Sequence, residues 1–67
     1  MTESDFMELN LSSGDYIRID TISGSSHDGA YGGNYNNSTL EFDFDNHTTG
    51  RQEIVCLTDL HAIIKKV

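Results

Sequence analysis

The stretch that decides the fold is residues 39–67, TLEFDFDNHTTGRQEIVCLTDLHAIIKKV. Apolar and acidic residues alternate strictly at its start, which reads Leu40, Glu41, Phe42, Asp43 and Phe44. A period of two is the pattern of a β-strand with one buried face. A polar turn (46–50), an apolar run (51–57), a tight corner (58–61) and a second apolar run (62–67) follow. The stretch therefore predicts three consecutive strands, and the corner predicts one turn of 3₁₀ helix.

The first part of the chain predicts a short helix and one strand. In residues 2–11, Thr2 or Ser4 can cap a helix, acidic residues occupy its first turn, and Phe6 and Leu9 recur at helical spacing. A helix this short is unstable alone, so its apolar face must dock on the sheet or on another subunit. Residues 15–22 alternate apolar and polar side chains, as in a strand.

The segments that follow are rich in glycine. Residues 23–29 (SGSSHDG) have the composition of a loop. Residues 30–37 (AYGGNYNN) predict a strand in which Gly32 and Gly33 form a bulge or a sharp bend, as a small barrel requires. Close approach of a ligand or partner to these glycines is the alternative.

Together these elements predict one mainly β domain over residues 1–67. It consists of a short N-terminal helix (residues 1–11, or a frayed arm) and five short antiparallel strands that form a small closed barrel or sandwich. Apolar residues on both faces of 51–57 (Ile54 and Cys56 on one, Val55 and Leu57 on the other) predict a central or doubly covered strand. Lys65 and Lys66 predict a guarded edge.

The C-terminal half resembles the last two strands of Sm-like and SH3-like small barrels. The resemblance lies in a strand ending in VCL (Val55–Leu57), a TDL turn (Thr58–Leu60) and a closing AII strand (Ala62–Ile64). It implies a small barrel that tends to form rings or dimers. RNA binding is not implied, because the TDLH corner lacks the Arg-Gly or Lys-Gly pair of the Sm signature.

Size, charge and cysteine content limit the functions open to the chain. With 67 residues it has a small core, which predicts oligomerisation. The net charge of −7 opposes binding to duplex nucleic acid or anionic membranes and suits docking onto a basic protein surface or simple solubility. Cys56 is the single cysteine and is expected to be a small buried hydrophobe. Without a signal peptide or a membrane-spanning apolar run, the expected location is the cytoplasm.

Two clusters carry residue types used in metal binding or catalysis. Asp43, Asp45 and His47 would share a face of a straight strand and could bind a divalent ion, but the turn at 46–50 breaks that geometry. The run Ser25, Ser26, His27 and Asp28 offers a nucleophile, a base and an orienting acid without any nucleophile-elbow motif. The sequence therefore predicts no enzyme, no metal and no cofactor.

A third set of residues suits binding. Tyrosine and arginine dominate binding hot spots, and asparagine with tyrosine can hold a planar base. The candidate binding residues are Tyr16, Arg18, Tyr31, Asn34, Tyr35, Asn36 and Arg51. The alternative is that the tyrosines only fill the ends of the barrel with their hydroxyls in water.

Two functional hypotheses follow. The first is a non-enzymatic interaction or inhibitor protein, such as a bacteriophage accessory protein that counters a host defence system by binding a host protein; its basis is the acidic charge and the lack of catalytic motifs. The second is a homo-oligomeric small-ligand binder that sequesters a nucleotide-type signalling molecule between subunits.

Overall fold

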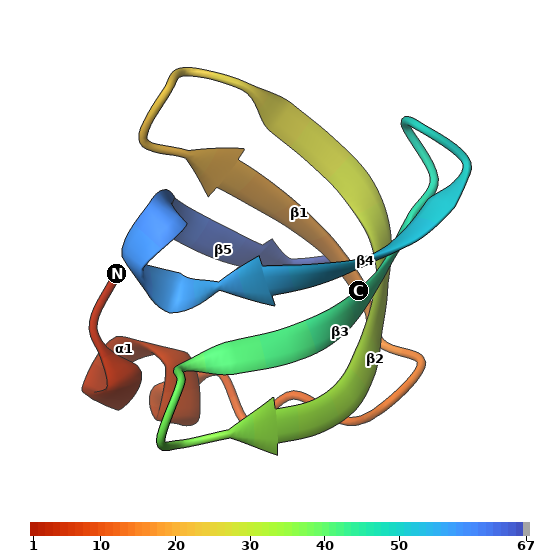
Figure 1. The fold of residues 1–67 in the computed structure, drawn as a ribbon. Coiled ribbons are helices and arrows are strands. Elements are labelled where there is room, and N and C mark those ends of the chain that lie inside the picture. The colour runs from red at the N-terminus through yellow and green to blue at the C-terminus, as the bar shows by residue number, and fades with distance from the viewer. Residues whose placement is uncertain (67) are drawn as a thin grey trace.

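One antiparallel sheet makes up most of this structure, a computed structural model that describes residues 1–66. A short helix precedes the strands, whose order across the sheet is β4-β3-β2-β1-β5. The elements (Figure 1) are α1 (Glu3–Glu8), β1 (Tyr16–Thr21), β2 (Ser26–Asn36), β3 (Glu41–Asn46), β4 (Arg51–Cys56), the 3₁₀ turn η1 (Leu57–Asp59) and β5 (Leu60–Lys65). The prediction of a mainly β fold with an N-terminal helix and five antiparallel strands is confirmed. So is the 3₁₀ turn at the corner.

The sheet curls but does not close into a barrel, which corrects the prediction of closure. Within residues 1–66, β4 and β5 form the two ends of the sheet and are not hydrogen-bonded to each other. The cause is the corner between them, where η1 redirects the chain so that Leu60 pairs with Thr21 of β1 rather than with β4. Figure 1 shows the long, bent β2 joining the two halves of the curled sheet.

Strand β2 is longer than the sequence predicts, because residues 26–29 belong to it and not to a loop. Ser26 and Asp28 pair with Asp20 and Arg18 of β1. The predicted glycine bend is confirmed by register shifts against β3 on both sides of Gly33, which has a positive φ of 81°. The bend lets β2 pair with β1 in one half of the sheet and with β3 in the other.

The core lies between α1 and the concave face of the sheet. Its members share nearly complete burial and come from α1, all strands except β4, and η1: Phe6, Ile17, Ile19, Tyr31, Phe42, Phe44, Leu57, Leu60 and Ile63. The ring centroid of Phe6 lies 5.6 Å from that of Phe42 and 4.6 Å from that of Tyr35. The helix therefore docks in cis, on its own sheet. Its predicted cap is confirmed at Thr2, whose Oγ1 accepts a hydrogen bond from the Asp5 amide at 3.1 Å.

Strand β4 is an edge strand, so the prediction of a central or doubly covered strand is wrong. Ile54 is 70% exposed on the outer face, and Cys56 is half-buried rather than buried, its Sγ lying 3.4 Å from the Thr39 carbonyl oxygen. Leu40 departs from the predicted strand as well, since it lies in the preceding turn with a φ of 61°. Val67, the predicted end of the last strand, lies outside the described residues.

Candidate functional site

The structure separates the seven candidate binding residues into several places. Tyr31 and Tyr35 lie under α1, and Tyr16 and Arg18 lie on the outer face of β1. Asn34 and Asn36 are at the end of β2 and line one hollow, while Arg51 is at the start of β4. The fold of one chain therefore brings Asn34 and Asn36 to one hollow and Tyr31 and Tyr35 to another, and does not combine the whole set into a single surface.

Tyr31 and Tyr35 hold the helix on the sheet. Tyr31 is only 7% exposed and packs edge-on against Phe6. The Tyr35 hydroxyl donates a hydrogen bond of 2.6 Å to Glu3 Oε2, which ties β2 to the first turn of α1. Burial of the phenol, followed by this hydrogen bond and the charge of Glu3, raises the pKa of Tyr35 to about 12. Both tyrosines thus serve the fold of the single chain.

We predict that Glu3→Gln lowers the pKa of Tyr35, because it removes an acceptor and a negative charge that oppose the phenolate. The pKa of Tyr35 is about 12 in the folded protein against 10.0 for a free phenol, so its contribution to stability is complete below pH 10 and is lost as the pH rises toward 12. Phenolate absorbance during an alkaline titration measures the shift. Glu8→Gln, on the same helix, is the control, and an unchanged titration in Glu3→Gln would contradict the assignment.

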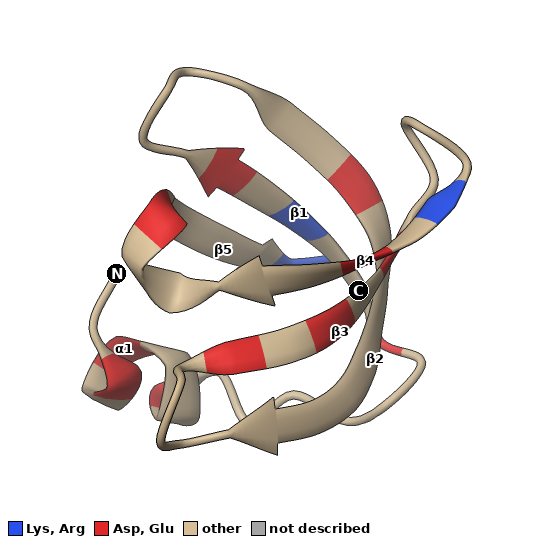
Figure 2. Cartoon of the chain, in the orientation of Figure 1, with Lys and Arg blue, Asp and Glu red and all other residues tan. Residues whose placement is uncertain are grey.

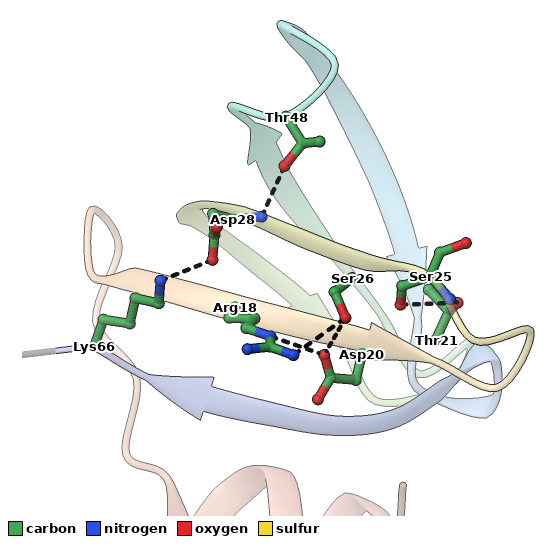
Figure 3. Close-up of polar contacts among 8 residues, drawn as sticks. All are labelled: Arg18, Asp20, Thr21, Ser25, Ser26, Asp28, Thr48 and Lys66. Carbon is green, nitrogen blue, oxygen red and sulfur yellow. Dashed lines mark hydrogen bonds and ion pairs between the residues drawn. The ribbon is translucent and has the colours of Figure 1, made fainter.

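Figure 3 shows two cations at the outer face of β1 and β2, Arg18 and Lys66, each lying against an acid. Arg18 Nε donates to Asp20 Oδ1 at 3.0 Å, and Ser26 Oγ donates to the same oxygen at 2.7 Å. The Ser26 hydrogen bond, followed by that of Arg18, lowers the pKa of Asp20. Lys66 Nζ lies 2.9 Å from Asp28 Oδ1. The charges on this face are therefore balanced locally.

The β3–β4 hairpin turn carries a second polar cluster. His47 Nδ1 lies 3.0 Å from the Tyr16 hydroxyl, and His47 Nε2 lies 3.4 Å from Asp45 Oδ2. Asp43 is engaged elsewhere, by Asn34. Among residues 1–66 no three metal-ligating side chains gather in one place. The link between Tyr16 and His47 depends on packing of distant segments and has no signal in the sequence.

The negative charge that no cation balances comes mainly from α1 and β3. Three of the four cations are paired, Arg18 with Asp20, Lys65 with Asp15 and Lys66 with Asp28. In the described chain, the acids without a cationic partner are Glu3, Asp5, Glu8, Glu41, Asp43, Glu53 and Asp59. Figure 2 shows acidic segments on α1, β3 and η1, with no Lys or Arg on these elements. On β3, Glu41 and Asp43 alternate with the buried Phe42 and Phe44, so the outer face of this strand is acidic.

A shallow hollow at β3 extends from the end of β2 to Ile54 of β4. It has a volume of about 170 Å³ and is lined by Asn34, Asn36, Glu41, Phe42, Asp43 and Ile54, a set we call the acidic groove. Asn34 Nδ2 donates to Asp43 Oδ2 at 2.8 Å, which fixes that carboxylate at the wall of the groove. Ile54 adds an exposed apolar side chain. The sequence predicted the two asparagines as binding residues but not Ile54, because the pattern gives no signal that β4 is an edge.

A second hollow lies between α1 and β2. Its volume is about 200 Å³, and its lining is Phe6, Met7, Asn10, Leu11, Tyr31 and Tyr35. Pockets for small molecules usually measure about 300–1,000 Å³. No charged side chain lines this hollow to bind a phosphate. It therefore fits a nucleotide poorly.

Comparison of the chain with models of protein families, with curated protein sequences and with solved structures gave no match. The Sm-like or SH3-like resemblance accordingly stays a prediction. In residues 1–66, no helix is long and apolar enough to cross a membrane.

Proposed function

We propose that this chain is a non-enzymatic binding protein that docks through its acidic groove onto a basic surface of another protein. The observation that supports this proposal is the uneven distribution of charge. Acids and cations are paired on the outer face of β1, β2 and β5, whereas Glu41 and Asp43 have no cationic partner within residues 1–66. An unpaired acidic surface attracts basic partners and accelerates their association.

Ile54 gives this surface an apolar centre. Protein interfaces combine a small apolar contact region with a polar rim. Ile54 stands 70% exposed at the groove, with Glu41 and Asp43 of the neighbouring strand beside it. Burial of a side chain of this size contributes about 1.5–3 kcal/mol relative to full exposure. Such a contact supplies affinity that exposed charges alone do not give.

Two more specific functional hypotheses came from the sequence analysis. The identity of the partner as a host defence protein, and of the chain as a phage protein, stays a prediction. The nucleotide-binding alternative also stays a prediction, because its site would be shared between subunits and the structure describes one chain. Within that chain Tyr31 and Tyr35 are engaged in packing under α1.

We predict that Glu41→Gln combined with Asp43→Asn abolishes capture of basic partner proteins. The control is Asp20→Asn combined with Asp28→Asn, which changes the net charge by the same amount at β1 and β2, where these acids are paired with cations. Both double variants and the wild type serve as baits in a host lysate, and captured proteins are compared by mass spectrometry. Basic proteins retained by the wild type and the control, and lost from the groove variant, are the expected result.

Two outcomes contradict the proposal. If both double variants lose the same proteins, net charge and not the groove governs binding. If the groove variant retains every protein that the wild type captures, the groove is not the docking site.

A further inference from the structure

Within residues 1–66, no strand pairs with the outer edge of β4, so backbone groups along this edge have no partner strand. Leu57 N donates to Leu40 O at 2.8 Å, and the β3–β4 pairing continues from Glu41↔Cys56 to Asn46↔Arg51 without a shift. Hydrogen-bonded and non-hydrogen-bonded pairs alternate along an antiparallel ladder. Val55 therefore bonds to β3, whereas Gln52 and Ile54 turn their N–H and C=O groups toward the open side.

The two edges of the sheet differ in how they are protected. Natural sheets guard their edges with lysines, prolines and bulges. The β5 edge has Lys65, followed at once by Lys66, and its pairing with β1 shifts at Asp20/Thr21. The β4 edge has a regular six-residue strand without lysine, proline or register shift, and Ile54 stands exposed in its middle. Such an edge is open to pairing with another strand.

We infer that β4 binds an extended, basic segment of the partner protein as an added antiparallel or parallel strand. The inference rests on the proposed function and specifies its mode. In such complexes main-chain hydrogen bonds supply affinity, and alternate side chains supply specificity. Side chains of the added strand on the outer face lie next to Ile54 and reach toward Glu41 and Asp43, which suits lysine or arginine. Those on the inner face extend the apolar surface of Val55, which packs against the core.

A short capped peptide of alternating lysine and valine is the probe for this edge. Its binding to the full chain is measured by fluorescence anisotropy, with a glutamate–valine peptide as the control probe. We expect the lysine peptide to bind and the glutamate peptide not to bind. Hydrogen exchange of the complex is expected to show new protection at the Gln52 and Ile54 amides, a result that needs no variant. Binding without protection of these amides would overturn strand addition.

The variant that tests the backbone directly is Ile54→Pro. Proline removes the outward N–H and is tolerated on an edge strand where that N–H faces solvent. We expect it to weaken binding of the lysine peptide by about tenfold or more, the effect of losing at least one hydrogen bond and blocking the edge. Ile54→Leu keeps both the N–H and the apolar volume of the side chain, and we expect a change of less than about threefold. Equal effects of the two substitutions would contradict pairing through the backbone.

Failure of this inference is distinguishable from failure of the proposed function. Peptide binding that is lost in Glu41→Gln/Asp43→Asn but retained in a folded Ile54→Pro supports the acidic groove and overturns strand addition. The reverse pattern supports the edge and overturns docking by charge. A dimer seen by light scattering in the wild type and absent in Ile54→Pro would show that a second copy of this chain covers the edge, which would also overturn the inference.

Discussion

Gly29→Ala is expected to unfold the protein. Gly29 lies in β2 between Ile17 of β1 and Asn46 of β3, where the strands approach closely. A Cβ at this position would lie 2.0 Å from the Asp45 carbonyl oxygen and 2.8 Å from the ring of Phe44. The carbonyl belongs to the backbone of β3 and cannot move without disturbing the ladder. We expect a loss of about 3 kcal/mol or more, and a domain of this size rarely has more than about 3–5 kcal/mol of stability.

Gly50→Ala is the control. It shows whether the loss of stability comes from the steric clash at Gly29 or from the replacement of any glycine. Gly50 has a φ of 75° in the β3–β4 turn, and an added Cβ would meet no atom within 4 Å. The left-handed conformation alone costs about 1–2 kcal/mol for alanine. Urea unfolding followed by circular dichroism measures both variants. A Gly29→Ala protein as stable as Gly50→Ala would show that the strands separate there at little cost.

Gly29 also shows where sequence patterns stop being informative. The alternation of apolar and acidic residues around Phe42 and Phe44 predicts a strand. This prediction requires only the periodicity of one segment of the sequence. Gly29 stands in a serine- and glycine-rich segment that has the composition of a loop, yet residues 26–29 pair with β1. The reason is tertiary: small residues there let β1 and β3 approach β2 closely. Composition alone does not distinguish a strand packed closely between two neighbouring strands from a solvent-exposed loop.

Of the candidate site, the sequence predicted the acidic charge and the two asparagines of the lining, Asn34 and Asn36. The excess of acids, including Glu41 and Asp43, is plain in the sequence, and so is the absence of a catalytic motif. The place of β4 at the edge is not, because apolar residues on both faces of a strand usually indicate burial. Pairing of Leu60 with β1 after η1 leaves β4 at the end of the sheet and exposes Ile54. The binding role of Tyr31 and Tyr35 was inferred from residue type, whereas their positions under α1 follow from the cis docking of the helix.

We predict that Phe6→Ala detaches α1 and costs about 3–5 kcal/mol, the usual loss for removal of a buried phenylalanine side chain. Phe6 is 5% exposed and contacts the rings of Tyr31, Tyr35 and Phe42, so no other side chain of the helix replaces it. Met7→Ala, on the same helix but 55% exposed, is expected to change stability by less than about 0.5 kcal/mol. Chemical denaturation gives both values, and loss of the high pKa of Tyr35 reports detachment independently. Equal stability of Phe6→Ala and Met7→Ala would contradict this prediction. It would mean that the strands alone form a core large enough to fold the sheet without its helix.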